Sequence, residues 1–261
     1  MKSSAKMLPT FMDLQLRNKV VLITGGSRGI GAAIVRAALA EGARVVNVDR
    51  CAPAQPEPRS HVIVADLIHA ENCKRAVQET LGKFGRIDAL VNNAGVNDRV
   101  GLERGSPEKF VESVKLNLFH YYNMTYYALE ALKKSRGNIV SISSKTAVTG
   151  QGETSGYVAS KGGILALTRE WAVELLPYQI RVNAVVPAEV WTPLYQQWLQ
   201  AFPDPEKKKA EIVSKIPLGK RMTTAEEIAS MVMFLISPQA AHITGQHLYV
   251  DGGYVHLDRA L

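Results

Sequence analysis

Short apolar runs and amphipathic stretches alternate along most of the chain. The first apolar run, residues 19–24, is continuous and rich in β-branched residues, as expected of a strand that is covered on both faces. A glycine-rich segment follows it, and residues 32–43 then place apolar side chains at helical spacing, with Gly42 as the stop. This pattern predicts a strand, a glycine loop and a helix in that order.

The same alternation continues through the rest of the chain. Further strands are expected at residues 44–49, 61–66, 87–95, 137–144, 180–187 and 246–253, and the one in 87–95 runs into a polar turn. Further helices are expected at residues 70–85, 107–134, 154–176 and 224–236. Parallel neighbours need crossover connections. The chain is therefore predicted to be an α/β protein, with one Rossmann-type, doubly wound, seven-stranded parallel sheet and helices on both faces.

The domain organisation follows from where this pattern begins and where it is interrupted. We expect a flexible N-terminal extension over residues 1–15 and one domain over residues 16–261. Residues 192–216 have irregular helical character broken by prolines, so we expect a substrate-loop excursion at about 188–218 rather than a second domain. In such sheets, ligands bind at the carboxyl ends of the strands, near the point where the strand order reverses.

Composition and charge exclude several classes of protein. Of the 261 residues 46% are hydrophobic and 21% charged, and the apolar runs are strand-sized, so we expect no membrane span. Cys51 and Cys73 have no metal-ligand spacing, so we expect no metal site, no disulfide framework and a cytoplasmic location. The net charge is +7, but the densest basic cluster, residues 207–209, is flanked by Glu206 and Glu211. We therefore expect a solvated face and no nucleic-acid partner.

The glycine loop between the first strand and its helix is typical of a dinucleotide site. Residues 24–31 read TGGSRGIG, in which Gly25, Gly29 and Gly31 allow a tight turn, close approach to a pyrophosphate and close helix packing. The alternative is a tight turn that binds nothing.

Two acids follow at the ends of neighbouring strands. Asp49 ends the second strand, where a carboxylate accepts hydrogen bonds from an adenosine ribose and repels a 2′-phosphate, which favours NAD. Arg28 and Arg50 lie close in sequence and could neutralise a 2′-phosphate, so NADP stays an alternative. Asp66 ends the third strand beside Leu67 and is expected at the adenine, or instead as the N-cap of the next helix.

Tyr157 and Lys161 lie four residues apart in a predicted helix, on the same face. An ordinary surface pair would have the same spacing. Five elements decide between these readings, because together they resemble the short-chain dehydrogenase/reductase family in order and spacing: residues 24–31, residues 92–95 (NNAG), Asn117, Ser144 and residues 157–161 (YVASK). The resemblance covers about residues 16–253.

This resemblance implies an oxidoreductase with a catalytic tetrad of Asn117, Ser144, Tyr157 and Lys161, assembled as a homotetramer or dimer. Contacts to the cofactor are expected from Gly25, Ser27, Arg28, Gly29, Ile30, Asp49, Asp66, Leu67, Asn93, Ala94, Gly95, Tyr157, Lys161, Pro187, Val190 and Thr192. One departure concerns the loop after the sixth strand, where the family usually has Pro-Gly and this chain has Pro187-Ala188. Because alanine does not readily adopt positive φ, this loop is expected to differ in shape.

The expected chemistry can also be argued from the residue types. A phenol has an unperturbed pKa near 10 and is a poor base at neutral pH, so a nearby Lys161 ammonium is expected to lower the pKa of Tyr157. Ser144 is expected to hold the substrate oxygen, and Asn117 to anchor a water chain from Lys161 to solvent. Each residue also has a purely structural alternative. Ser144 could be a strand-end hydroxyl that caps the next turn, and Asn117 a buried amide that forms hydrogen bonds with the backbone.

Substrate contacts are expected just beyond the strand ends, from Ser144, Gln151, Tyr157, Glu189 and Trp191. Acids, amides and an indole platform suit a monosaccharide, although loop residues are also polar simply because loops are exposed. Residues 150–161, 191–194 and 250–261 are most similar to the sugar-oxidising members of the family, the L-fucose dehydrogenases in particular. That similarity implies oxidation of the anomeric hydroxyl of L-fucose or a related aldose to its lactone.

Two other functions remain open at this point. One is a ketoacyl or hydroxysteroid dehydrogenase or reductase of the same family. The other is a non-catalytic dinucleotide-binding sensor, which would keep the glycine loop but would not need Ser144, Tyr157 and Lys161 together. Their joint presence favours the enzyme.

Overall fold

The computed structural model describes residues 13–257. Most of the expected extension at residues 1–15 lies outside this range. Asp13 and Leu14 already contact the folded domain: the Asp13 carbonyl oxygen accepts a hydrogen bond from Gln239 Nε2 (2.9 Å), and Leu14 packs against a buried cluster. Residues 13 and 14 of the expected extension therefore lie against the folded domain.

Seven strands form one parallel sheet in the order β3-β2-β1-β4-β5-β6-β9. The strands are β1 (Val20–Thr24), β2 (Arg44–Asp49), β3 (Ser60–Val64), β4 (Ala89–Asn92), β5 (Asn138–Ile142), β6 (Arg181–Pro187) and β9 (His247–Val250). Residues Val20–Thr24 are all buried, as a strand covered on both faces requires. The predicted fold class is confirmed.

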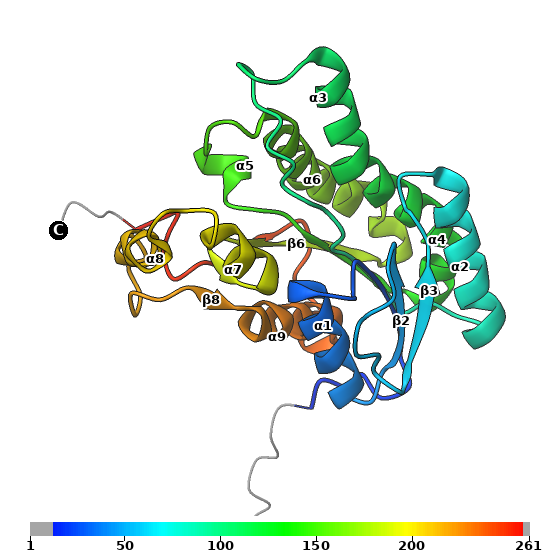
Figure 1. Cartoon of the computed structure of the whole chain (residues 1–261). Coiled ribbons are helices and arrows are strands. Elements are labelled where there is room, and N and C mark those ends of the chain that lie inside the picture. Colours follow the sequence, from blue (N-terminus) through cyan, green and yellow to red (C-terminus); the bar gives the residue numbers. More distant parts are fainter. Residues whose placement is uncertain (1–12, 258–261) are drawn as a thin grey trace, which may run out of the picture.

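The main helices cover the two faces of this sheet (Figure 1). The long elements are α1 (Gly29–Ala40), α2 (Ala70–Phe84), α3 (Pro107–Val114), α4 (His120–Ser135), α6 (Ser155–Glu174) and α9 (Ala225–Ile236). Val21 and Ile23 of β1 pack in the cluster that contains α1 and α9, while Leu22 packs in the cluster that contains α2, α4 and α6. This alternation follows from the two-residue period of a strand.

Shorter elements occupy the connections. They are α5 (Thr146–Thr149), α7 (Pro193–Leu199), α8 (Pro205–Ser214), the short helical turns η2 (Leu176–Tyr178) and η3 (Pro238–Ala240), and the two-residue strands β7 (Val190–Trp191) and β8 (Thr223–Thr224). The segment expected to be an excursion is thus organised as α7 and α8. The sequence pattern did not predict α5 or the β7–β8 pair, because elements of two to four residues carry no measurable periodicity.

The predicted helix over residues 107–134 is interrupted. A π-helical turn, η1 (Lys115–Phe119), separates α3 from α4 and contains the fully buried Asn117. Such turns insert a residue into a helix and often occur at functional sites. The helical period alone does not reveal this interruption.

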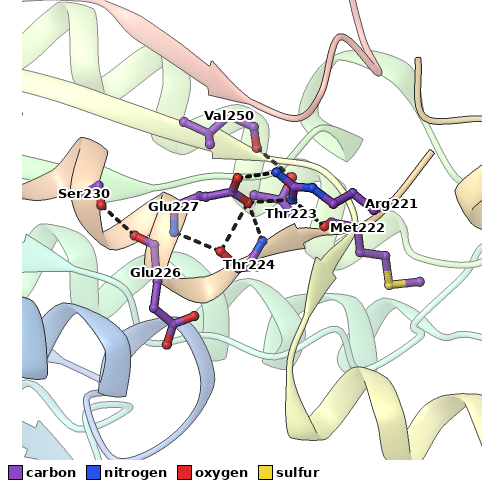
Figure 2. Close-up of polar contacts among 8 residues, drawn as sticks. All are labelled: Arg221, Met222, Thr223, Thr224, Glu226, Glu227, Ser230 and Val250. Atoms are coloured by element: carbon purple, nitrogen blue, oxygen red, sulfur yellow. Dashed lines mark hydrogen bonds and ion pairs between the residues drawn. The ribbon is translucent and has the colours of Figure 1, made fainter. Parts of the chain in front are cut away.

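The N-terminus of α9 holds β8 in place (Figure 2). Thr224 and Glu227 form a capping box: Thr224 Oγ1 accepts a hydrogen bond from the Glu227 amide (3.1 Å), and the Glu227 carboxylate accepts one from the Thr224 amide (2.8 Å). Arg221 binds the same carboxylate through both terminal nitrogens, and it is the main cause that lowers the pKa of Glu227 to about 2. Because β8 pairs with β7, this cap also fixes Val190.

None of the helices within residues 13–257 combines the length and the apolar character needed to cross a membrane. Both cysteines are free, Cys51 at the surface and Cys73 in the core.

Candidate active site

A cavity of about 530 Å³ opens at the carboxyl ends of the strands, over the point where the strand order reverses between β1 and β4. Every residue expected to contact the cofactor lines this cavity except Ser27. Ser144 lines it as well. The fold therefore brings together predicted site residues that lie as far apart in the sequence as Gly25 and Thr192, as expected for this class of sheet.

The glycine loop is shaped by close backbone contacts. Gly25 has φ of +69°, and a side chain on Gly31 would overlap the Gly25 carbonyl oxygen and lie 2.6 Å from Asn93 Nδ2. Asn93 Nδ2 donates to the carbonyl oxygens of Thr24 and Gly25, at 3.0 Å each. Helix α1 therefore approaches the loop as closely as a dinucleotide cradle requires.

Ser27 acts behind this cradle rather than inside it. Its amide donates to Asp49 Oδ2 (3.0 Å), and its hydroxyl donates to the Cys51 carbonyl oxygen (2.8 Å). Asp49, at the end of β2, lines the cavity, as do the exposed Arg28 and Arg50. Ser27 thus orients the carboxylate that the sequence associated with the adenosine ribose.

Asp66 lies in the cavity wall after β3, next to the buried Leu67. Its Oδ1 accepts a hydrogen bond from the Ile68 amide (3.1 Å), whereas the residue that precedes α2 is His69. The alternative role of Asp66 as the N-cap of α2 is therefore wrong, because the N-cap residue is His69, three positions further on.

The proposed proton acceptor, Tyr157, lies in the first turn of α6, and Ser144 follows β5. Both residues line the cavity. Burial raises the pKa of Tyr157, and the hydrogen bond to Ser144 opposes this rise. The chain by itself does not produce the expected lowering of the phenol pKa, because the loss of solvation outweighs the hydrogen bond.

Lys161 lies one turn further along α6 and is 3% exposed. Its Nζ donates to the carbonyl oxygen of Ile142 (2.8 Å) and to the hydroxyl of Tyr121 (3.1 Å), and it lies 5.6 Å from the centre of the Tyr157 ring. Burial lowers the pKa of this ammonium to about 7. The pair is therefore not an ordinary surface pair.

Asn117 makes two backbone hydrogen bonds. Its Oδ1 accepts from the Val96 amide (2.8 Å), and its Nδ2 donates to the Ser113 carbonyl oxygen (3.1 Å). A side chain on Gly95 would lie 3.1 Å from Asn117 Oδ1 and 3.5 Å from Lys161 Nζ, so the amide is close to the ammonium. Asn117 therefore holds the NNAG turn beside Lys161. The predicted water chain from Lys161 stays a prediction.

Two buried residues near the site were not predicted from the sequence. Tyr121 is fully buried, and its hydroxyl donates to the Ile142 carbonyl oxygen (2.9 Å). His120 lines the cavity without a hydrogen bond of good geometry on either ring nitrogen, and burial lowers its pKa to about 3. The spacing of four between Asn117 and Tyr121 was an available signal, since such residues share a helix face.

Three expected substrate residues lie outside the cavity wall. Gln151 is exposed in the loop before α6, and Trp191 is 36% exposed with Lys209 Nζ 4.6 Å from its ring centre. Glu189 is largely buried and is paired with Lys145. The polar residues that do line this side of the cavity include Asn97, Tyr195 and Gln197.

Glu189 belongs to a network that joins four segments. Its Oε1 pairs with Lys145 Nζ, and its Oε2 accepts a hydrogen bond from the Tyr195 hydroxyl (2.7 Å). Lys145 directly follows Ser144, and its Nζ lies 4.1 Å from the centre of the Tyr254 ring. Glu189 therefore acts on the cavity through Tyr195 of α7.

The loop after β6 tolerates Ala188 without the left-handed conformation, because Ala188 is not among the residues with positive φ. Thr192 caps α7 by accepting a hydrogen bond from the Tyr195 amide (3.2 Å), and it still lines the cavity.

Comparison with known proteins places this geometry in a family. Residues 25–255 match the family described as enoyl-(acyl carrier protein) reductase. The chain is 39% identical to the L-fucose dehydrogenase of Bos taurus over 93% of this chain and 91% of that protein. It matches the crystal structure of the Cj0485 dehydrogenase with a TM-score of 0.93 and 46% identity, covering 96% and 99% of the two chains.

A second solved structure is the ligand-free aldohexose dehydrogenase of Thermoplasma acidophilum, with a TM-score of 0.89, 34% identity and coverage of 94% and 97%. These relatives are oxidoreductases, and the enzymes of the family act on CH–OH groups with a nicotinamide cofactor. The motifs, the sheet and the sequence matches agree: the chain belongs to the short-chain dehydrogenase/reductase family.

Proposed function

We propose that this protein oxidises the anomeric hydroxyl of an aldose, such as L-fucose, to the lactone with NAD as hydride acceptor. One observation carries the proposal: Ser144, Tyr157 and Lys161 line the same cavity as the glycine loop. The L-fucose and aldohexose dehydrogenases among its relatives favour a sugar. The amides of Asn97 and Gln197 in the cavity wall suit a ligand with several hydroxyls.

When it is bound, the nicotinamide supplies the hydride acceptor. The reaction breaks the C–H bond at the anomeric carbon with its electron pair, and it removes the proton from the anomeric oxygen, so that a carbonyl forms. Tyr157 accepts that proton, and Ser144 donates a hydrogen bond to the same oxygen and limits the charge that develops on it. Both side chains line the same cavity, which supports a substrate oxygen shared by the two hydroxyls.

Lys161 provides the charge that makes this base usable. Burial alone raises the pKa of Tyr157, so phenolate needs a cation nearby. Lys161 lies one helical turn from Tyr157 and has no ion-pair partner in the described part of the chain. Its charge is therefore free to act on the phenolate.

We propose NAD rather than NADP as the preferred cofactor. Asp49 is held in the cavity by the Ser27 amide, and a carboxylate there repels a 2′-phosphate. Arg28 and Arg50 are exposed, and within residues 13–257 the hydrogen bonds to the Asp49 carboxylate come from the Ser27 and Cys51 amides, so no ion pair with an arginine offsets this repulsion.

A homotetramer is the assembly we propose. Exposed aromatic side chains support it, since Tyr122 and Tyr126 stack on one face of α4 with Phe119 one turn before Tyr122. Such a cluster is typical of a surface that another chain covers. We propose the cytoplasm as the compartment, in keeping with the two free cysteines.

The test is an assay of NADH or NADPH formation with the purified protein on a panel of aldoses. A hydroxysteroid and a 3-hydroxyacyl thioester serve as competing substrates. We expect at least one aldose to be oxidised, faster with NAD than with NADP, and the lactone to be trapped by hydroxylamine. Turnover confined to the steroid or the thioester would contradict the sugar proposal.

The second candidate is an acyl-carrier-linked reductase, which the description of the matching family favours. A third candidate is the non-catalytic sensor. Binding of NADH without turnover of any tested compound would support it.

A further inference from the structure

The ammonium of Lys161 is buried, and no carboxylate within residues 13–257 forms an ion pair with it. An ammonium taken out of water needs hydrogen-bond acceptors, because its desolvation is otherwise very unfavourable. In the described part of the chain, two groups accept hydrogen bonds from Lys161 Nζ: the Ile142 carbonyl oxygen at 2.8 Å and the Tyr121 hydroxyl at 3.1 Å. The second is a side chain that the tetrad of the family does not include.

Tyr121, Lys161 and Ile142 form a closed triangle of hydrogen bonds. The Tyr121 hydroxyl accepts from Lys161 Nζ and donates to the Ile142 carbonyl oxygen (2.9 Å), which also accepts from Lys161. Because the hydrogen of the Tyr121 hydroxyl is donated to Ile142, this hydroxyl presents a lone pair to the ammonium. The main chain of Lys161 is fixed as well, since the Ser143 hydroxyl donates to its carbonyl oxygen (2.8 Å).

The elements around the triangle hold it rigidly. The Tyr121 ring is fully buried between the sheet and the helices α4 and α6, in the cluster that contains Met124 and Ile164. The Lys161 ammonium lies 5.2 Å from the centre of that ring, so the ring face adds a weak cation–π attraction. The position of the ammonium relative to Tyr157 is therefore set from α4 as much as from α6.

We propose that Tyr121 is a positioning residue for the reaction: its hydroxyl holds the Lys161 ammonium in its charged form at the place where it acts on Tyr157. This inference rests on the proposed roles of Tyr157 and Lys161. Tyr121 does not touch the reacting atoms, and it acts through Lys161.

Few other groups compete for control of this charge. Tyr157 faces Lys161 from α6, and Asn117 approaches it from η1. His120 on α4 interacts with Lys161, but burial lowers the pKa of that imidazole to about 3, so it stays neutral at ordinary pH. Asp66 acts on His120, and no carboxylate pairs with Lys161 within residues 13–257.

The removal of the Tyr121 hydroxyl has a defined consequence for pH dependence. Burial already lowers the pKa of Lys161 to about 7, and the loss of one acceptor lowers it further. Lys161 is then neutral over more of the pH range in which the substrate is oxidised, so the Tyr157 phenolate lacks a nearby positive charge. The pKa of Tyr157 rises, and the ascending limb of kcat/KM against pH moves to higher pH.

The test compares Tyr121→Phe with the parent protein on the aldose that is oxidised fastest. We expect the ascending limb to move up by about one pH unit, which corresponds to about 1.4 kcal/mol. The matched control is Tyr127→Phe, which removes a hydroxyl from the same helix away from Lys161 and is expected to leave the limb in place. The phenylalanine ring keeps the packing, and the Ile142 carbonyl oxygen keeps its donor from Lys161.

An unmoved limb in Tyr121→Phe, with or without a lower kcat, would overturn the inference, because a purely structural role does not shift an ionisation. The second measurement is the ultraviolet tyrosinate absorbance of the NADH complexes during a pH titration. The signal lost in Tyr157→Phe must appear at higher pH in Tyr121→Phe than in the parent. If Tyr157→Phe itself keeps full turnover, the proposed role of Tyr157 fails first, and the two failures are thereby distinguished.

Discussion

The cofactor side and the substrate side of the cavity are built in different ways. On the cofactor side, backbone groups form the wall, and glycines such as Gly25 and Gly31 are required by contacts between main-chain atoms. On the substrate side, side chains from separate segments meet, as in the network of Lys145, Glu189 and Tyr195. Short-range sequence motifs specify the first kind of wall, whereas tertiary packing specifies the second.

The two sides also differ in how many of the residues expected from the sequence line the cavity. Of the residues expected at the cofactor, only Ser27 does not line the cavity, and it still orients Asp49. Of the expected substrate residues, Gln151, Glu189 and Trp191 do not line it. A backbone cradle thus tolerates little change, and a side-chain network is expected to tolerate more.

In the comparison of the two sides of the cavity, the larger effect is predicted for Gly31→Ala. The added methyl group would overlap the Gly25 carbonyl oxygen and approach Asn93 Nδ2, so helix α1 and the glycine loop must separate. Overpacking of this kind costs about 1–3 kcal/mol. We therefore expect the affinity for NADH, measured by fluorescence titration, to fall by about tenfold to a hundredfold.

The control for this change is Gly82→Ala, on the exposed face of α2. Nothing lies within 4 Å of the position its methyl group would take, and alanine favours a helix by about 0.5–1 kcal/mol over glycine. This variant is expected to bind NADH normally and to unfold at a slightly higher temperature. Unchanged NADH affinity in Gly31→Ala would mean that the close approach of α1 is not needed for binding.

A smaller effect is predicted for Glu189→Gln. The change keeps the shape of the side chain but removes its negative charge. That charge forms the ion pair with Lys145 and strengthens the hydrogen bond that Glu189 accepts from the Tyr195 hydroxyl. A hydrogen bond to a charged group contributes about 1 kcal/mol more than one between neutral groups. We expect KM for the sugar to rise by about fivefold in steady-state assays, with little change in NADH affinity.

The matching control on the same side is Gln151→Ala, which changes an exposed side chain outside the cavity wall. Its KM is expected to stay within about twofold, as for most surface substitutions. If Gln151→Ala raised KM more than Glu189→Gln, the sugar would contact the loop before α6 directly, as the sequence suggested.

Much of the fold could be predicted from the sequence because its central strands are continuous apolar runs buried on both faces. Residues 19–24 and 44–49 were recognisable on this ground, and the structure places strands at Val20–Thr24 and Arg44–Asp49. The β7–β8 pair was not predictable, since it depends on the contact of residues about thirty positions apart. The position of Val190 depends on the same contact.

The candidate site shows the same limit. The spacing of Tyr157 and Lys161 indicated that they share a helix face, and both line the cavity. The hydroxyl of Tyr121 at Lys161 was not predicted, because it depends on how α4 packs against β5 and α6. The expected lowering of the pKa of Tyr157 was also incomplete, because sequence reasoning counted the nearby charge and not the burial.

The central claim is that one cavity holds the cofactor and presents the Tyr157 hydroxyl to the substrate as the proton acceptor. The most direct test measures turnover and NADH binding side by side in Tyr157→Phe. General base catalysis contributes about 10²–10⁴-fold, so we expect turnover to fall by at least about a hundredfold while NADH affinity changes by less than about threefold. Turnover at the parent's rate in this variant would contradict the account.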